Sequence, residues 1–180
     1  MKIIAFAGMP FSGKSEAVKI AKKMKIPVIR MGDMVWQEVK NRNLEINDKN
    51  VGFVANEMRE KHGKDIWAKR TINKIKEIEN TEHLVIDGIR NIEEVETFKK
   101  ELKGDFILIG VEVSDETRYK RAMQRNRKDD SKDLGKIKER DNRELKWGLG
   151  NVISSADIII SNEKDIESFR KDIKKVFNKL

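Results

Sequence analysis

The chain has 180 residues, of which 38% are hydrophobic and 39% charged, and its formal net charge at pH 7 is +8. This composition is typical of a soluble globular protein with one core, and no apolar run reaches the roughly 20 residues of a membrane-spanning helix. Cysteine is absent and only two histidines are present, which excludes disulfides and cysteine or histidine metal sites and favours a cytoplasmic location.

Short apolar runs alternate with amphipathic segments along the chain. The apolar runs predict strands at residues 2–8, 26–32, 83–88, 105–113 and 156–161. The amphipathic segments predict helices at residues 13–24, 33–43, 51–63, 65–80, 91–102, 114–126, 136–145 and 165–180. Asp33 and Asn91 are predicted N-caps, and the segment 114–126 starts at a Ser-Asp cap. This alternation indicates an α/β fold with a five-stranded parallel sheet covered by helices on both faces.

No repeat or Pro/Gly/Ser-rich linker divides the chain, so we expect residues 1–180 to form one domain. In parallel sheets, ligands bind at the carboxyl ends of the strands. The predicted strands place five short segments at this rim: 8–15, 30–33, 87–90, 113–116 and 161–163.

The segment from Gly8 to Ser15 matches G-x-x-x-x-G-K-[ST], the phosphate-binding P-loop, and lies between a predicted strand and a predicted helix. In this motif, Lys14 would bridge the β- and γ-phosphates and the Ser15 hydroxyl would ligate Mg²⁺. The Phe11 side chain either excludes water near the γ-phosphate or covers the edge of the core. We assign nucleotide binding to Gly8, Met9, Pro10, Phe11, Ser12, Gly13, Lys14, Ser15 and Glu16.

A second acidic motif follows the strand at 83–88. In "LVIDG", Asp87 stands where a Walker B carboxylate holds Mg²⁺ through water, although a strand-ending Asp-Gly turn has the same letters. Arg90 lies on the same rim, where its guanidinium can grip the phosphate of an acceptor. The metal site is therefore assigned to Ser15 and Asp87.

An arginine-rich helix is predicted after the fourth strand. Its spacing places Arg118, Arg121 and Arg125 on one face, where they would surround a moving phosphoryl group. The alternative is a surface helix whose charge is balanced by neighbouring acidic residues. Only Tyr119 falls within this cluster, and this scarcity of aromatic residues argues against nucleic-acid binding.

In their order along nearly the whole chain, these motifs resemble the P-loop nucleoside-monophosphate kinases, such as adenylate kinase. The resemblance implies a three-layer P-loop NTPase fold, an acceptor-binding helical region at about 32–80 and a short lid at about 126–140. "RMGD" resembles the T-G-D segment of that family, with Gly32 and Asp33 matching. Asp33 either orients the acceptor or caps its helix, and the second interpretation is favoured. "ADIIISNE" resembles dephospho-coenzyme A kinase, which implies that Asn162 lies near the adenine.

The arginines complete this resemblance. Arg121 and Arg125 match the adenine-side and phosphate-side arginines, and Arg127 and Arg140 match the lid arginines. The implied catalytic residues are Lys14, Asp87, Arg127 and Arg140. The implied acceptor-binding residues are Gly32, Asp33, Trp36, Arg59, Arg70 and Arg90.

One departure alters the acceptor site. Trp36 stands where adenylate kinase carries the arginine that holds the acceptor phosphate, and Arg30, Arg59 and Arg70 are placed to compensate. Trp36 either stacks on a base or packs half-buried in the core, and the second interpretation is favoured. Trp147 likewise either stacks on a base or packs the lid.

The combination "GMP-SGKSE", "RMGD", "VIDGIR" and "RELKWGLG" resembles more closely a family of archaeal nucleotide kinases related to dephospho-coenzyme A kinase. These resemblances imply a kinase that moves the γ-phosphate of ATP, with Mg²⁺, to a nucleoside monophosphate or to dephospho-coenzyme A. The alternatives are a P-loop ATPase that acts as a regulatory or assembly factor, and a nucleic-acid-binding protein that uses the +8 charge.

Overall fold

The computed structural model describes residues 1–124 and 133–180, apart from the side chain of residue 48. Its strands are β1 (Lys2–Ala7), β2 (Val28–Arg30), β3 (His83–Asp87), β4 (Phe106–Glu112) and β5 (Ile158–Ser161). The helices of the N-terminal half are α1 (Lys14–Lys23), α2 (Met31–Asn41), α3 (Asp48–His62) and α4 (Ile66–Ile75). Those that follow are α5 (Ile92–Leu102), α6 (Asp115–Gln124), α7 (Leu134–Lys146), α8 (Leu149–Ser154) and α9 (Ile166–Lys179).

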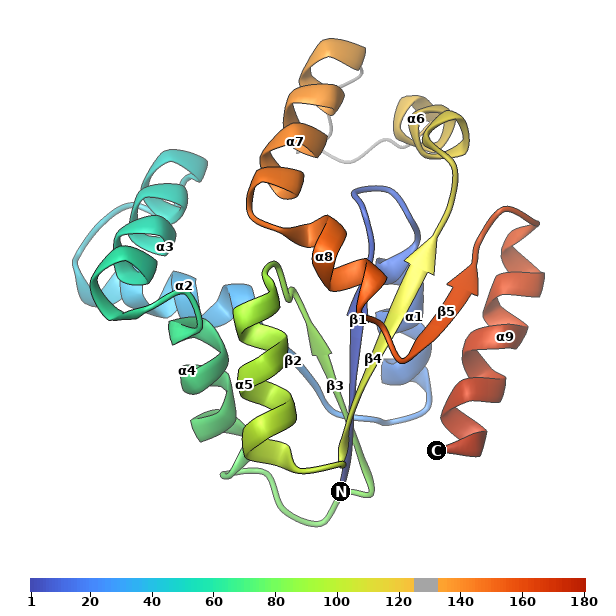
Figure 1. The fold of residues 1–180 in the computed structure, drawn as a ribbon, viewed down its shortest axis with the longest axis horizontal. Helices are drawn as coiled ribbons and strands as arrows, with labels where there is room; N and C mark the ends of the chain where they lie inside the picture. The colour runs from blue at the N-terminus through green and yellow to red at the C-terminus, as the bar shows by residue number, and fades with distance from the viewer. Residues whose placement is uncertain (125–132) are drawn as a thin grey trace.

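The five strands form one sheet in the order β2-β3-β1-β4-β5, and every neighbouring pair is parallel (Figure 1). Strand β1 lies in the middle, where Phe6 pairs with Asp87 of β3 and with Ile109 of β4. This register brings the end of β1, which leads into the P-loop, beside Asp87 at the end of β3. The predicted five-stranded parallel sheet is confirmed.

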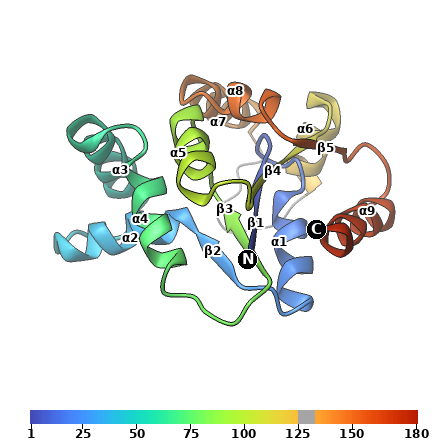
Figure 2. The same cartoon turned by 60° about the horizontal axis from the view of Figure 1, so that its bottom comes forward.

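Alternating side chains of the strands pack into two hydrophobic cores, one on each face of the sheet. Ile4 and Phe6 pack with α1 and α9, whereas Ile3 and Ala5 pack on the other face against α5 and α8. Figure 2 shows α1 and α9 on one side of the sheet and α5 and α8 on the other. The predicted three-layer arrangement is therefore present, because both faces of a parallel sheet must be covered.

Helices α2, α3 and α4 form a lobe beside the β2 edge, over much of the region predicted to bind the acceptor (Figure 1). Val35, Val39 and Trp67 join this lobe to the core on the α5 side of the sheet. The N-cap prediction for Asp33 is wrong: Arg30 is the N-cap, α2 begins at Met31, and Asp33 lies within the first turn. The short strand β2 ends at Arg30 and leaves no linker before the helix.

The predicted caps of α5 and α6 are confirmed. The Asn91 side chain accepts a hydrogen bond from the Glu94 backbone N–H and so caps α5, as predicted. The Ser114 hydroxyl accepts one from the Thr117 N–H before α6. Helix α8 was not predicted, since its six residues are too few for a helical period to show. In the part of the chain that the structure describes, no helix is long and apolar enough to cross a membrane.

Candidate functional site

The P-loop forms a tight turn between β1 and α1 that only small residues permit at two positions. Gly13 has a φ of 108°, and a Cβ there would lie 2.3 Å from the Asn162 side-chain nitrogen. At Gly8, a Cβ would lie 2.8 Å from the Val111 carbonyl oxygen. The loop thus places Gly13 at the N-cap of α1, and a helix N-terminus is a position that binds phosphate.

Lys14 lies inside this loop. Its Nζ donates hydrogen bonds to the carbonyl oxygens of Gly8 and Met9, the latter at 3.2 Å. Burial lowers the pKa of Lys14 to about 8, although the nearby charges of Asp87 and Glu144 act in the opposite direction. The site thus holds a partly buried cation, which an anionic ligand would stabilise.

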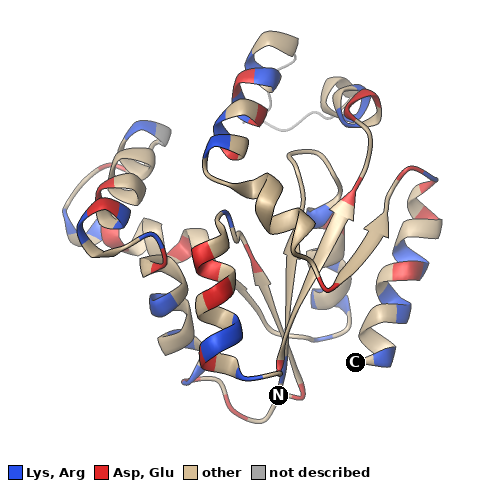
Figure 3. Cartoon of the chain, in the orientation of Figure 1, with Lys and Arg blue, Asp and Glu red and all other residues tan. Residues whose placement is uncertain are grey.

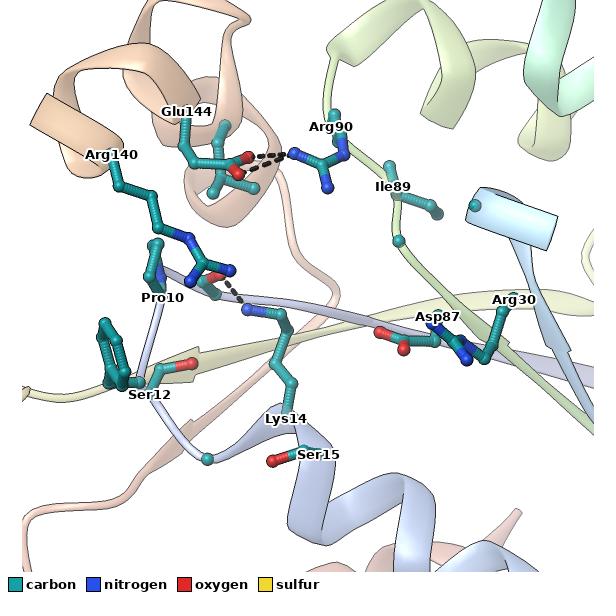
Figure 4. Close-up of a pocket in the computed structure, with 16 residues that line it drawn as sticks. Pro10, Ser12, Lys14, Ser15, Arg30, Asp87, Ile89, Arg90, Arg140 and Glu144 are labelled. Carbon is teal, nitrogen blue, oxygen red and sulfur yellow. Dashed lines mark hydrogen bonds and ion pairs between the residues drawn. The ribbon is translucent and has the colours of Figure 1, made fainter. Parts of the chain in front are cut away.

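Lys14 faces a cleft of about 330 Å³ at the carboxyl ends of β1 and β3. Ser15 lines it from the start of α1, and Asp87 points into it from β3 (Figure 4). The hydroxyl of Ser15 and the carboxylate of Asp87 are hard oxygen donors of the kind that Mg²⁺ prefers. Among the described residues, no group of three or more His, Cys, Asp and Glu side chains gathers to hold a metal.

Helix α7 covers the cleft from the opposite side. Arg140 reaches down toward the P-loop (Figure 4), and its guanidinium carbon lies 5.7 Å from the centre of the Phe11 ring. Glu144, one turn further along α7, accepts two hydrogen bonds of 2.6 Å from the Arg90 guanidinium. Phe11 thus lines the cleft and supports an arginine of α7.

Arg118 does not face the cleft, and the prediction that it surrounds the moving phosphate is wrong. It is only 1% exposed and forms a salt bridge of 2.6 Å with Asp141 of α7. It also donates a hydrogen bond of 3.0 Å to the Pro10 carbonyl oxygen. Arg118 therefore ties α6 and α7 to the backbone of the P-loop.

The residues predicted near the adenine come together behind the loop. Asn162 donates a hydrogen bond of 2.7 Å to the Ser12 carbonyl oxygen, and Arg121 donates one of 2.7 Å to the Asn162 carbonyl oxygen. Glu16 turns away from the cleft toward α9 and pairs with Arg170 at 2.7 Å. These three residues brace the P-loop from outside the cleft that Lys14 faces.

A second cavity, of about 220 Å³, adjoins the cleft and shares Arg30, Gly32, Gly88 and Arg90 with it. Trp36, Trp67 and Trp147 lie in its wall. Trp36 is 39% exposed rather than packed in the core, so the favoured interpretation of this residue is wrong. The Arg30 guanidinium carbon lies 5.3 Å from the centre of its ring.

Trp147, at the end of α7, is surrounded by arginines. The guanidinium carbons of Arg90, Arg143 and Arg59 lie 5.0, 5.7 and 5.9 Å from the centre of its ring. Arg59 also donates a hydrogen bond of 3.3 Å to Glu94. Burial raises the pKa of the Glu94 carboxyl, while the Arg59 charge and the Arg90 backbone N–H partly oppose that shift.

Other predicted residues lie apart from these cavities. Arg70 pairs with Glu38 at 2.7 Å in a separate groove between α2 and α4. Asp33 is exposed and lies 3.9 Å from the Arg30 guanidinium. Arg125 and Arg127 lie outside the described residues.

Three buried carboxylates that pair with the arginines around the site were not predicted: Glu144, Glu94 and Asp141. Asp141 and Glu144 share the buried face of α7 with Ile137. A helical wheel of residues 134–146 carries this signal, since acidic residues on the apolar side of a helix require cationic partners.

Comparison with known proteins places the chain in a family. A family model described as an AAA domain matches residues 7–138. The chain is 47% identical over 178 residues to a UPF0200 protein of Methanosarcina acetivorans, an alignment that covers 99% of this chain and 95% of the relative. It is 42% identical over 181 residues to a UPF0200 protein of Methanococcus maripaludis, covering 100% of this chain and 98% of the relative.

Two solved structures share the fold. TT1252 from Thermus thermophilus superposes with a TM-score of 0.65 at 15% identity, covering 99% of this chain and 97% of the other. Shikimate kinase from Aquifex aeolicus gives a TM-score of 0.51 at 20% identity, covering 98% and 96%. The chain therefore shares its fold with this P-loop kinase, and it belongs to the UPF0200 family.

Proposed function

We propose that this protein is an ATP-dependent kinase that transfers the γ-phosphate of ATP to a small nucleotide-like acceptor. The observation that carries the proposal is the pair of adjoining cavities. One surrounds the P-loop lysine and the other is lined by tryptophans and arginines, and the two share Arg30, Gly32, Gly88 and Arg90. A donor in the first and an acceptor in the second would meet at this shared wall.

In this proposal, the P-loop N–H groups and Lys14 hold the triphosphate. Ser15 and, through water, Asp87 would hold Mg²⁺, which supplies charge neutralisation on the phosphates when it is bound. Arg140 of α7 extends over the same cleft, where its guanidinium adds positive charge opposite Lys14 (Figure 4). Arg127, which stands outside the described residues, remains the second proposed lid arginine.

The second cavity has the chemistry to hold an acceptor with a flat ring and an anionic group. Trp36 and Trp147 offer aromatic faces to the ring, while Arg30 and Arg90 lie toward the P-loop and suit the anion. Of the acceptor-binding residues implied by the sequence, we therefore retain Gly32, Trp36, Arg59 and Arg90, and we add Arg30 and Trp147. Arg70 and Asp33 are not part of this proposal, because neither lines the two cavities.

The transfer itself requires little covalent chemistry from the protein. The bond between the γ-phosphorus and the β–γ bridging oxygen breaks as the bond to the acceptor oxygen forms, and ADP leaves. A phosphate acceptor reacts as an oxyanion and needs no base, whereas a hydroxyl acceptor would release its proton to Asp87. The residues therefore act by aligning the two ligands and excluding water from the cleft.

The proposal is tested by measuring ADP and phosphorylated product with a panel of acceptors: nucleoside monophosphates, their deoxy forms and dephospho-coenzyme A. One acceptor should raise ADP release and yield product in equal amount. Lys14→Ala should abolish transfer, while Lys19→Ala, an exposed position on the same helix, should leave it unchanged. Release of ADP and free phosphate that no acceptor alters would contradict the proposal and point to a regulatory ATPase.

A further inference from the structure

The buried face of α7 is unusual because two of its three buried residues are acidic. Ile137 is followed by Asp141 and Glu144, which are 4% and 6% exposed. Charged groups at such positions are costly unless they are paired. Helix α7 is therefore held over the P-loop cleft largely by ion pairs rather than by apolar packing.

The two ion pairs differ in their surroundings. Asp141 pairs with Arg118, which is itself buried and also holds the Pro10 carbonyl oxygen, while the Tyr119 hydroxyl donates a hydrogen bond of 3.2 Å to Asp141. A ligand in the cleft does not reach this pair, because neither residue lines the cavity. The Asp141–Arg118 pair is thus a fixed attachment of α7.

The pair between Glu144 and Arg90 lines the cleft instead. The Arg90 side chain is 39% exposed, and both residues border the space between the P-loop and the second cavity. One guanidinium nitrogen of Arg90, Nη1, donates to both carboxylate oxygens of Glu144, at 2.6 Å each. A phosphate group would also offer anionic oxygens to this guanidinium.

We propose that Glu144 is a specificity-determining residue, an internal anion that competes with the acceptor's anionic group for Arg90. This inference rests on the proposed function, since it assigns Arg90 to the acceptor. An acceptor that is anionic at this point must displace Glu144 from Arg90. An acceptor that is neutral at this point leaves the ion pair in place. Glu144 thereby weakens the binding of anionic acceptors relative to neutral ones.

Inorganic phosphate is the probe for this competition. The full-length protein is first saturated with Mg²⁺ and a non-hydrolysable ATP analogue, so that the P-loop is filled, and phosphate is then titrated by calorimetry. Glu144→Gln keeps the side-chain shape but removes the charge, and should bind phosphate about tenfold more tightly than the wild type. Glu144→Asp, whose shorter side chain holds Arg90 less well, should give an intermediate gain.

Two further variants separate this effect from others. Glu139→Gln removes an exposed charge from the same helix and should leave phosphate affinity unchanged. In an Arg90→Met background, Glu144→Gln should give no gain, because the shared partner is missing. A thermal melt of each variant confirms that it is folded.

Equal phosphate affinity in Glu144→Gln and the wild type would overturn the inference, as would a gain of the same size in Glu139→Gln or one that persists without Arg90. If Glu144→Gln does not fold, Glu144→Asp decides the question by the same criterion. A protein that does not bind the ATP analogue contradicts the proposed function as well, whereas analogue binding without the Glu144 effect contradicts this inference alone.

Discussion

At the scale of single residues, Lys14 is partly buried and lies near the charged groups of Asp87 and Glu144. Its ammonium lies inside the P-loop, and burial is the largest influence on its pKa, which is lowered to about 8. A triphosphate would restore the charged form, because an adjacent anion favours the protonated amine. Nucleotide binding and protonation of Lys14 are therefore linked.

This linkage predicts the pH dependence of nucleotide binding. Below pH 8 the Lys14 amine of the free protein is charged, so the affinity for the ATP analogue is at its full value. As the pH rises above 8, the affinity should fall by about tenfold per unit until the higher pKa of the complex is reached. The measurement is the dissociation constant from about pH 7 to about pH 9.5. Lys19→Ala should show the same profile, and a flat profile in the wild type would refute the linkage.

At the scale of single elements, Asn91 stabilises the start of α5 and joins it to the segment before α4. Its side-chain oxygen caps α5, and its side-chain nitrogen donates a hydrogen bond of 3.1 Å to the Lys64 carbonyl oxygen before α4. It thus attaches the loop that carries Arg90 to the lobe formed by α2, α3 and α4. The acidic first turn of α5 and its basic last turn, visible in Figure 3, suit the helix dipole as well.

The cap predicts a measurable loss of stability. Asn91→Ala should lower the free energy of unfolding by about 1 to 2 kcal/mol, because both hydrogen bonds are lost in a buried setting. The comparison is Asn47→Ala, which removes the exposed cap of α3 and should cost about 0.5 to 1 kcal/mol. Urea denaturation measures the free energy of unfolding of both variants. Equal losses in the two variants would contradict the larger contribution expected from the buried cap.

The buried ion pair between Arg118 and Asp141, which attaches α7, predicts a larger loss of stability. Arg118→Met leaves Asp141 buried without its cation, which should lower the free energy of unfolding by about 3 to 5 kcal/mol. Arg118→Met/Asp141→Leu should recover most of this loss, since no unpaired charge remains. The exposed pair of Lys175 and Asp172, 3.0 Å apart, serves as the control, and Lys175→Ala should cost about 0.5 kcal/mol or less. A double variant no more stable than Arg118→Met would contradict this account.

At the scale of the molecule, the ligands would bind where β1, β3, α1 and α7 meet. A nucleotide that touches these elements binds only the folded chain and therefore stabilises all of it. With the Mg²⁺–ATP analogue at about one hundred times its dissociation constant, stabilisation should be about 2.7 kcal/mol.

This gain corresponds to a rise in melting temperature of roughly 5 to 10 °C for a chain of this length. Differential scanning fluorimetry measures it. Lys14→Ala should show almost none of the rise, while Lys175→Ala, far from the cleft on α9, should show all of it. An equal rise in Lys14→Ala would place the nucleotide elsewhere.

Local sequence determined the sheet, most of the helices, the P-loop and the Asn91 cap. Apolar runs and helical periods act over a few residues, and a glycine such as Gly13 is required by the backbone of its own turn. The position of Asp87 at a strand end followed from the same local pattern. These features could be predicted because neighbours along the chain decide them.

Tertiary structure decided which side chains meet. Arg90 and Glu144 are 54 residues apart, and only the docking of α7 over the cleft makes them partners. The same docking withdrew Arg118 into a buried pair with Asp141, although its helical spacing had placed it with the phosphate-binding arginines. The lobe of α2 to α4 left Trp36 on a cavity wall rather than in the core. Charge pairing across the fold depends on distances that no local pattern contains, and those distances set the chemistry of the site.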